Sequence, residues 1–308
     1  MTTHYYSHPM SAEHTTPPGH PERADRVKVV NEILRKPSFY NLKKEEAPQA
    51  DAATFEYAHP KSFIKSIQEK IPETGLVQID NDTIASPKSF EAVQYAVGAA
   101  LAGVDDVFEK KADNVFAGMR PPGHHAEKST AMGFCFVNSI AIAARYAQEK
   151  YGAERIAIVD FDVHHGNGTQ DIFYDDKSVL FCSTHQMPLF PGTGAISEEG
   201  VGNIFNAPLS AGADGSAFKE AFTSRILPAV DNFAPDLLLI SAGFDAHYRD
   251  PLAGLNLTAN DFDWVTGALM ELAGKHCENR LVSLLEGGYD LEGLAESVEA
   301  HVNRLMTG

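Results

Sequence analysis

The stretch RIAIVDFDVHHGNG, residues 155–168, decides the fold of this chain. An uninterrupted apolar run rich in β-branched residues ends at Asp160 and passes at once into aspartate, histidine and glycine. A short apolar run without alternating polarity is typical of a strand that is buried on both faces, as in a parallel sheet. The polar residues then follow the carboxyl end of the strand, which is where open α/β sheets form their sites.

Three further segments have the same form: NVFAGMRPPGHHA (114–126), DLLLISAGFDAH (236–247) and LVSLLEGGYD (281–290). Parallel strands deliver their carboxyl ends to one edge of a sheet, so the polar residues of all four segments are expected to meet. These residues are His124, His125, Asp160, Asp162, His164, Asp245 and Tyr289. Such a constellation is typical of a metal-dependent hydrolase.

Strand-like and helix-like patterns alternate along the rest of the chain. Strands are expected at 114–118, 155–161, 178–183, 237–241 and 281–285. Helices are expected at about 21–34, 60–72, 86–111, 137–150, 169–174, 216–231 and 259–276, and from 291 onward. This alternation predicts an α/β fold with a central, mostly parallel β-sheet flanked by helices on both faces. No repeat or linker interrupts residues 1–308, which we interpret as a single domain.

Two segments lack a clear pattern. The His-rich amino terminus is interpreted as a rim loop or an N-terminal strand, and the Gly- and Pro-rich stretch 185–215 as a long irregular loop. Long irregular loops in compact domains are often functional.

Composition narrows the class of protein. With 25 basic and 42 acidic residues the formal net charge is −17, which disfavours nucleic-acid binding and can attract cationic substrates, although many soluble proteins are simply acidic. The three cysteines have no CxxC spacing, which indicates reduced thiols. The amino terminus lacks an apolar leader, and no apolar run approaches the ~18 residues of a membrane span. We therefore expect a cytoplasmic protein without a membrane partner, and the sequence leaves assembly into a homo-oligomer open.

Asp162 and His164 are the centre of the metal hypothesis. As an i, i+2 pair after a strand they point to the same side, and Asp245 can supply the third ligand. Two aspartates and one histidine leave positions free for water and substrate, as a catalytic site requires. Zinc is favoured, with Fe(II), Co(II) and Mn(II) left open. The competing interpretation is a buried hydrogen-bonded network.

His124 and His125 are candidates for general acid–base catalysis near neutral pH, or alternatively for metal binding. Asp160 and Asn167 are the candidates for orienting them, and Asp160 can equally serve a structural cation. Tyr289 follows two glycines that allow a close backbone approach, and its phenol can donate to a developing oxyanion.

Phe134 and Phe190 lie in loops beside Gly133 and before Pro191-Gly192. Two such aromatic side chains can wall a narrow slot for an aliphatic chain. Ordinary core packing is the alternative.

Six motifs together resemble the zinc-dependent histone deacetylase superfamily, which also includes acetylpolyamine amidohydrolases and acetoin-utilisation proteins. They are RPPGHHA (120–126), GFCFVNSIAIAA (133–144), DFDVHHGNGTQDIF (160–173), FPGTG (190–194), SAGFDAHYRDPL (241–252) and LEGGYD (285–290). The resemblance extends over about residues 15–300 and implies the arginase-like α/β fold of these deacetylases.

The resemblance also implies roles for individual residues. Zinc binding falls to Asp162, His164 and Asp245, the acid–base pair is His124 and His125, and Tyr289 polarises the amide carbonyl. The substrate channel is assigned to Gly133, Phe134, Phe190 and Leu252, a structural potassium ion to Asp160, Asp162, His164, Ser183 and Thr184, and the channel that releases acetate to Arg26.

Details within the motifs indicate a subgroup. Asn167 in HHGNG and the sequence after Asp245 are similar to class II members and to compact bacterial homologues. Leu252 stands where a polyamine-selective relative has glutamate, and Tyr289 is present where a weakly active class II subset has histidine.

The resemblance implies hydrolysis of N-acetyl amides, first of all ε-N-acetyl-lysine in proteins or peptides, with release of acetate. The alternatives are an acetylpolyamine or other small-molecule amidohydrolase, a non-catalytic acyl-lysine binder, and a binuclear arginase-like ureohydrolase.

Overall fold

Eight strands form one continuous sheet in the computed structural model, which describes all 308 residues. Their order across the sheet is β2-β1-β5-β10-β9-β6-β7-β8, and every pairing is parallel. The strands are β1 (Thr3–Ser7), β2 (Lys43–Glu46), β5 (Asn114–Ala117), β6 (Ile156–Asp160), β7 (Val179–Gln186), β8 (Ile204–Leu209), β9 (Leu237–Ala242) and β10 (Leu281–Leu285). A separate antiparallel pair joins β3 (Val77–Gln78) to β4 (Ile84–Ala85). The predicted parallel sheet is confirmed.

The apolar strand sequences fill a core on each face of the sheet. In β6, Ile156 and Ile158 belong to one core, and Ala157 and Val159 belong to the other, because successive side chains of a strand point to opposite faces. Both faces are therefore buried, which explains why the strands read as continuous apolar runs.

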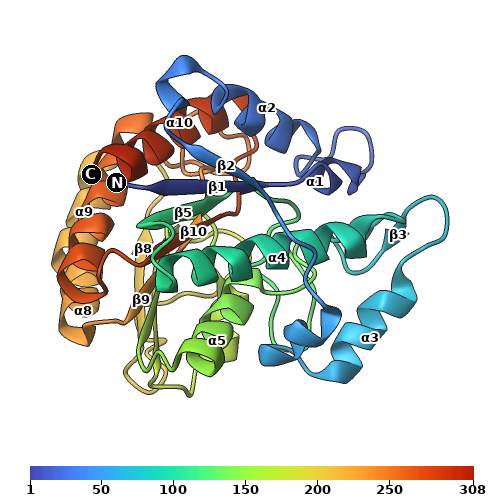
Figure 1. The fold of residues 1–308 in the computed structure, drawn as a ribbon, viewed down its shortest axis with the longest axis horizontal. Helices are drawn as coiled ribbons and strands as arrows, with labels where there is room; N and C mark the ends of the chain where they lie inside the picture. The colour runs from blue at the N-terminus through green and yellow to red at the C-terminus, as the bar shows by residue number, and fades with distance from the viewer.

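Helices cover both faces, as predicted (Figure 1). One core is covered by α3 (Lys61–Lys70), α4 (Ser89–Phe108) and α5 (Ser139–Tyr151). The other is covered by α2 (Asp25–Ile33), α7 (Gly215–Ala221), α8 (Leu227–Phe233), α9 (Ala259–His276) and α10 (Leu291–Thr307). Short elements complete the fold: α1 (Met10–Glu13), α6 (Asn167–Phe173), two 3₁₀ helices (Pro37–Phe39 and Ala52–Tyr57) and a π-helix (Phe222–Ile226) that joins α7 to α8.

Local sequence signals fix several helix ends. The side chain of Asn138 accepts the N–H of Ala141 at the start of α5, and Gly152 ends the same helix in the left-handed conformation. Thr258 and Asp261 form a reciprocal capping box at the start of α9. The predicted boundaries of α9 agree with the structure for this reason.

The interpretation of 185–215 as one irregular loop was wrong. The strand β7 extends to Gln186, and the same stretch contains β8. Asn206 and Pro208 interrupt the apolar run of β8, and proline is tolerated there because β8 is an edge strand with only one hydrogen-bonded neighbour. The helix expected at 216–231 is divided into α7, the π-helix and α8.

The two ends of the chain pack side by side. The hydroxyl of Thr3 in β1 donates to the carbonyl of Leu305 in α10 at 3.0 Å, and both termini lie on the same side of Figure 1. None of the helices combines the length with the apolarity that crossing a membrane requires.

Candidate metal centre and active site

The four strands that carry the recurring sequence form are neighbours in the sheet, in the order β5-β10-β9-β6. Asp160 ends β6, and each of the other three strands leads into a loop with site residues at the same edge. The structure thereby brings together all seven polar residues that the sequence singled out, and each of them is buried.

Asp162, His164 and Asp245 form a compact cluster of potential metal ligands. One ligand atom from each lies within 4.8 Å of the others, and Nδ1 of His164 is 3.2 Å from Asp162 and 3.1 Å from Asp245. Backbone N–H groups hold the carboxylates in place: Gly287 donates to Asp162 at 2.8 Å and Val163 to Asp245 at 2.9 Å. The cluster is the one group of this kind in the molecule.

The electrostatics of this cluster call for a cation. Burial lowers the pKa of His164, but hydrogen bonds that its ring N–H donates to Asp162 and Asp245 raise it to about 10. Burial and the nearby Asp162 carboxylate raise the pKa of Asp245 to about 7. Two buried carboxylates are stable side by side only with a positive charge between them, and the oxygen and nitrogen donors suit zinc. The donor set therefore fits a catalytic metal ion.

His124 and His125 lie next to the cluster with their ring centroids 4.0 Å apart. Their partners differ: Nδ1 of His124 faces Asp160 at 2.9 Å, whereas Nδ1 of His125 faces the amide oxygen of Asn167 at 2.8 Å. Gly133 leaves room for His125, since a Cβ at that position would clash with the imidazole.

The two histidines have pKa values that differ in opposite directions from the usual one. Burial by itself lowers the pKa of His124, but the carboxylates of Asp160 and Asp162 outweigh it and raise the pKa well above its usual range. Burial, followed by the charges of His124 and His164, holds the pKa of His125 well below its usual range. One histidine is therefore cationic and its neighbour neutral near pH 7.

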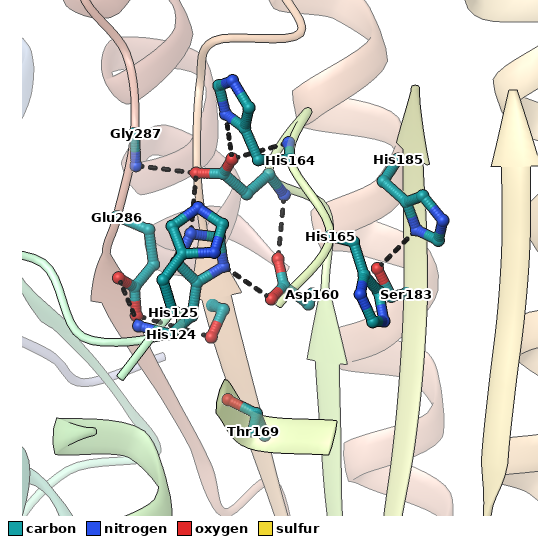
Figure 2. Close-up of polar contacts among 12 residues, drawn as sticks. His124, His125, Asp160, His164, His165, Thr169, Ser183, His185, Glu286 and Gly287 are labelled. Atoms are coloured by element: carbon teal, nitrogen blue, oxygen red, sulfur yellow. Dashed lines mark hydrogen bonds and ion pairs between the residues drawn. The ribbon is translucent and has the colours of Figure 1, made fainter. Parts of the chain in front are cut away.

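Glu286 is a buried carboxylate that the sequence reasoning missed. It accepts the backbone N–H groups of Gly123 at 2.7 Å and His124 at 3.2 Å, and burial raises its pKa to about 7. Figure 2 shows His124 between Asp160 on one side and Glu286 on the other. The glutamate of the LEGGYD motif was the available signal, but its partners are backbone groups that leave no sequence spacing.

A cavity of about 260 Å³ opens over this cluster. Its lining consists of Asp82, His125, Gly133, Phe134, His164, Leu189, Phe190, Leu252 and Tyr289. The four residues that the sequence assigned to a channel thus border one cavity together with His125, His164 and Tyr289. Asp82 was not anticipated, and burial together with the neighbouring Asp80 carboxylate raises its pKa.

Tyr289 is buried and lines this cavity. Its ring packs edge-on against Phe134 at 5.9 Å, and the guanidinium of Arg26 lies 4.9 Å from the ring centroid. Burial, with the cation of Arg26 opposing it, raises the pKa of Tyr289 well above its usual range. The hydroxyl is therefore protonated and able to donate a hydrogen bond near pH 7.

Arg26 is fully buried behind Tyr289. It donates to the carbonyl of Gly288 at 2.6 Å and to Glu22 at 3.0 Å, and it also contacts the carbonyl of Glu286. Glu22 is shared with the buried Arg120, so two guanidinium groups surround one carboxylate. Two buried guanidinium groups therefore lie on the side of Tyr289 that Arg26 occupies.

Ser183 and Thr184 lie in β7 beside the end of β6. The strand register pairs Asp160 with Ser183, whose hydroxyl is 2.9 Å from Nδ1 of His185 (Figure 2). The hydroxyl of Thr184 is buried and has no hydrogen-bond partner. Of the residues assigned to potassium, Asp162 and His164 belong to the ligand cluster described above.

The chain is similar to several known proteins. The histone deacetylase domain family model matches residues 20–305. A probable deacetylase of Archaeoglobus fulgidus is 36% identical over 315 residues, covering 100% of this chain and 87% of that protein. The chloroplastic histone deacetylase 10 of Oryza sativa subsp. japonica is 39% identical over 300 residues, which cover 91% of this chain and 68% of that protein.

The crystal structure of the HDA15 HD domain matches with a TM-score of 0.94 at 33% identity, and the match covers 99% of this chain and 88% of that one. The arginase-like deacetylase fold expected from the motifs is therefore present from β1 to α10. Since the family model extends over nearly the whole length of the sequence, this chain is a member of the histone deacetylase family.

Proposed function

We propose that this protein is a zinc-dependent deacetylase that hydrolyses the acetyl amide of ε-N-acetyl-lysine in proteins or peptides and releases acetate. The observation that carries the proposal is a single cavity that borders His125, His164 and Tyr289 below two aromatic walls. Asp162, His164 and Asp245 would hold the zinc ion. When bound, zinc supplies a Lewis acid that polarises a carbonyl oxygen and lowers the pKa of water.

His125 is the base in this proposal. The Nδ2 group of Asn167 donates to Glu127 at 2.8 Å, so its amide oxygen faces His125 and accepts from Nδ1. The proton of the imidazole is then on Nδ1, and the lone pair of Nε2 is free to take a proton from water. His124 keeps its own proton because Asp160 stabilises the cation.

Hydrolysis transfers a hydroxide to the acetyl carbon and breaks the carbon–nitrogen bond. The proton that His125 removes from water passes to the nitrogen of the leaving amine, so the same imidazole acts first as base and then as acid. The protonated hydroxyl of Tyr289 donates to the oxygen on which negative charge develops, a contribution of about 3 kcal/mol.

The walls of the cavity support a linear aliphatic substrate. Phe134 and Phe190 provide apolar faces, Gly133 adds no side chain between them, and Leu252 makes a further apolar contact. This lining matches the methylene chain of lysine better than a branched or charged group. Arg26 would attract the acetate product, since its buried guanidinium lies 4.9 Å from the centre of the Tyr289 ring.

An acetylpolyamine substrate is the second candidate. The carboxylate of Asp82 lines the cavity and the net charge of the chain is −17, and both features favour a substrate that carries a second cationic amine. Leu252 lies in the same lining and offers no charge to such an amine.

A substrate profile of the purified, zinc-loaded protein separates these candidates. We expect acetyl-lysine peptides to have a higher kcat/KM than acetylspermidine and acetylputrescine, with about one zinc ion per chain. A clear preference for the polyamines contradicts the lysine assignment. Absence of turnover on every acyl amide favours a non-catalytic binder, and two metal ions per chain favour a binuclear hydrolase.

We also propose that a potassium ion is held near the β6–β7 pair by Asp160, Asp162, His164, Ser183 and Thr184. The pairing of Asp160 with Ser183 and the unpartnered Thr184 hydroxyl support it, since hard cations prefer oxygen ligands. Potassium chloride is expected to raise the Tm more than tetramethylammonium chloride does at equal ionic strength.

A further inference from the structure

Asp250 is a buried carboxylate outside the metal cluster, in the loop between β9 and α9. One of its oxygens accepts the backbone N–H groups of Tyr289 at 2.7 Å and Asp290 at 3.3 Å. The other oxygen accepts the N–H of Leu252 at 3.0 Å. All its partners are donors, and they come from two loops that follow different strands.

The segment that Asp250 holds follows two glycines and is bound by Arg26 as well. Gly287 and Gly288 precede Tyr289, and Gly288 has a φ of +121°, a conformation that other residues rarely adopt. Arg26 binds the carbonyls on the amino-terminal side of Tyr289, and Asp250 binds the N–H groups at Tyr289 and after it. The backbone is therefore fastened from both sides by opposite charges, which sets the position of the phenol.

The same carboxylate fixes the position of Leu252 relative to Tyr289. Both residues line the cavity, one in the loop after β9 and the other in the loop after β10. A shift of either loop alone would separate a wall of the cavity from the group that donates to the oxyanion. Displacements of about 1 Å in an active site reduce rates on the order of 10²-fold.

We propose that Asp250 is a positioning residue for deacetylation, which anchors the Tyr289 backbone and joins it to the Leu252 wall of the cavity. The inference rests on the proposed function, because it assigns Asp250 an effect that is exerted through the Tyr289 hydroxyl. Asp250 itself contacts backbone groups and does not line the cavity.

The test is a double-mutant cycle with Asp250→Asn and Tyr289→Phe. Asparagine has the same shape but only one acceptor oxygen for donors on both sides, so we expect kcat on an acetyl-lysine peptide to fall about 10-fold with KM nearly unchanged. In the Tyr289→Phe background the same substitution should change kcat by less than about 2-fold. An equal loss in both backgrounds overturns the proposal.

A second readout does not depend on activity. Hydrogen exchange of the peptide that contains residues 287–291 is expected to be faster in Asp250→Ala, because two of its N–H groups then lose their acceptor. Unchanged exchange overturns the anchoring role. If the wild-type protein hydrolyses no acyl amide, the proposed function fails, and the exchange measurement still decides whether Asp250 anchors Tyr289.

Asp236→Asn is the matched control. One oxygen of Asp236 accepts two consecutive backbone N–H groups, those of Glu154 and Arg155, both at 2.9 Å, at the opposite edge of the sheet. We expect kcat and exchange at 287–291 to stay as in the wild type, because the remaining amide oxygen can still accept both N–H groups. An equal drop in kcat for both variants would reduce Asp250 to a general structural role and overturn the proposal.

Discussion

The strands of the parallel sheet all begin along one side, here called the amino edge, and end along the other, the carboxyl edge. The two edges use carboxylates in different ways. At the amino ends of β6 and β9, Asp236 caps backbone N–H groups, remains about one-third exposed and lies 3.8 Å from the Arg155 guanidinium. At the carboxyl ends of the same strands, Asp162 and Asp245 are buried next to each other within the ligand cluster.

Carboxylates therefore contribute to the stability of the fold at the amino edge and to the candidate metal site at the carboxyl edge. A solvated carboxylate that accepts N–H groups stabilises the fold by about 1 kcal/mol. Two buried carboxylates in one cluster repel each other, and a bound cation would offset that repulsion. The carboxylates of both edges accept backbone N–H groups, but only those of the ligand cluster also place two negative charges together, which a bound cation would compensate.

Neutralising Asp245 should give the largest effect. In Asp245→Asn we expect turnover to fall at least about 10³-fold and zinc no longer to co-purify, because a charged ligand is lost. The Tm of the metal-free variant should equal or exceed that of the metal-free wild type, since the repulsion with Asp162 is relieved. A clearly lower Tm in calorimetry of the two metal-free proteins would contradict the contrast between the edges.

A carboxylate at position 167 should sharpen the contrast within the carboxyl edge itself. In Asn167→Asp the new charge faces Nδ1 of His125 and stabilises its protonated form, so the low pKa of His125 rises. The acid limb of the kcat/KM profile should then move to higher pH by about one unit, with several-fold slower turnover near pH 6. An unshifted acid limb would mean that His125 is not the base.

His301 allows a test of protein stability that does not involve the candidate active site. It is fully buried between Thr266 at 2.7 Å and Ser283 at 2.9 Å, and burial lowers its pKa to about 3. Below pH ~6.5 His301 is protonated in the unfolded chain but stays neutral in the folded state. The free energy of unfolding therefore falls as the pH drops.

Between pH 7 and pH 5 this difference in protonation costs about 2 kcal/mol. The variant His301→Gln should therefore show a shallower loss of unfolding free energy over that range in urea titrations. A slope identical to that of the wild type would mean that His301 can be protonated within the fold.

The smallest effect is expected at the amino edge. In Asp236→Ala the N–H groups of Glu154 and Arg155 lose their acceptor but remain near solvent, so the free energy of unfolding should fall by about 1 kcal/mol. Turnover and zinc content should match the wild type. A change in kcat/KM would show that the two edges are coupled.

The inner strands could be predicted from the sequence because they are buried on both faces. The strand β10 was predicted with the bounds that it has, and β5, β6, β7 and β9 with ends that differ by up to three residues. The strands without a clear prediction include β2 and β8, which are the outermost strands of the sheet. Lys43–Glu46 is entirely charged, as suits an edge strand that must not pair further, and β8 contains Asn206 and Pro208.

The candidate site divides in the same way. The topology of a parallel sheet is enough to place residues that directly follow an apolar strand. On this basis His124, His125 and Asp245 were predicted to lie at the same edge. Glu286 and Asp250 could not be assigned from sequence, because their partners are backbone N–H groups of distant loops that leave no residue pattern. Asp82 lines the cavity from the loop between β3 and β4, and this loop is far in sequence from any strand of the main sheet.

The position of β10 has a consequence for biosynthesis. This strand is the last to emerge from the ribosome, yet it lies between β5 and β9 and is the only link between the two parts of the sheet. A nascent chain that ends before residue 281 therefore exposes two unsatisfied strand edges and lacks the loop that carries Tyr289. Completion of the sheet and completion of the proposed catalytic site then become one late event, so unfinished chains are aggregation-prone and inactive.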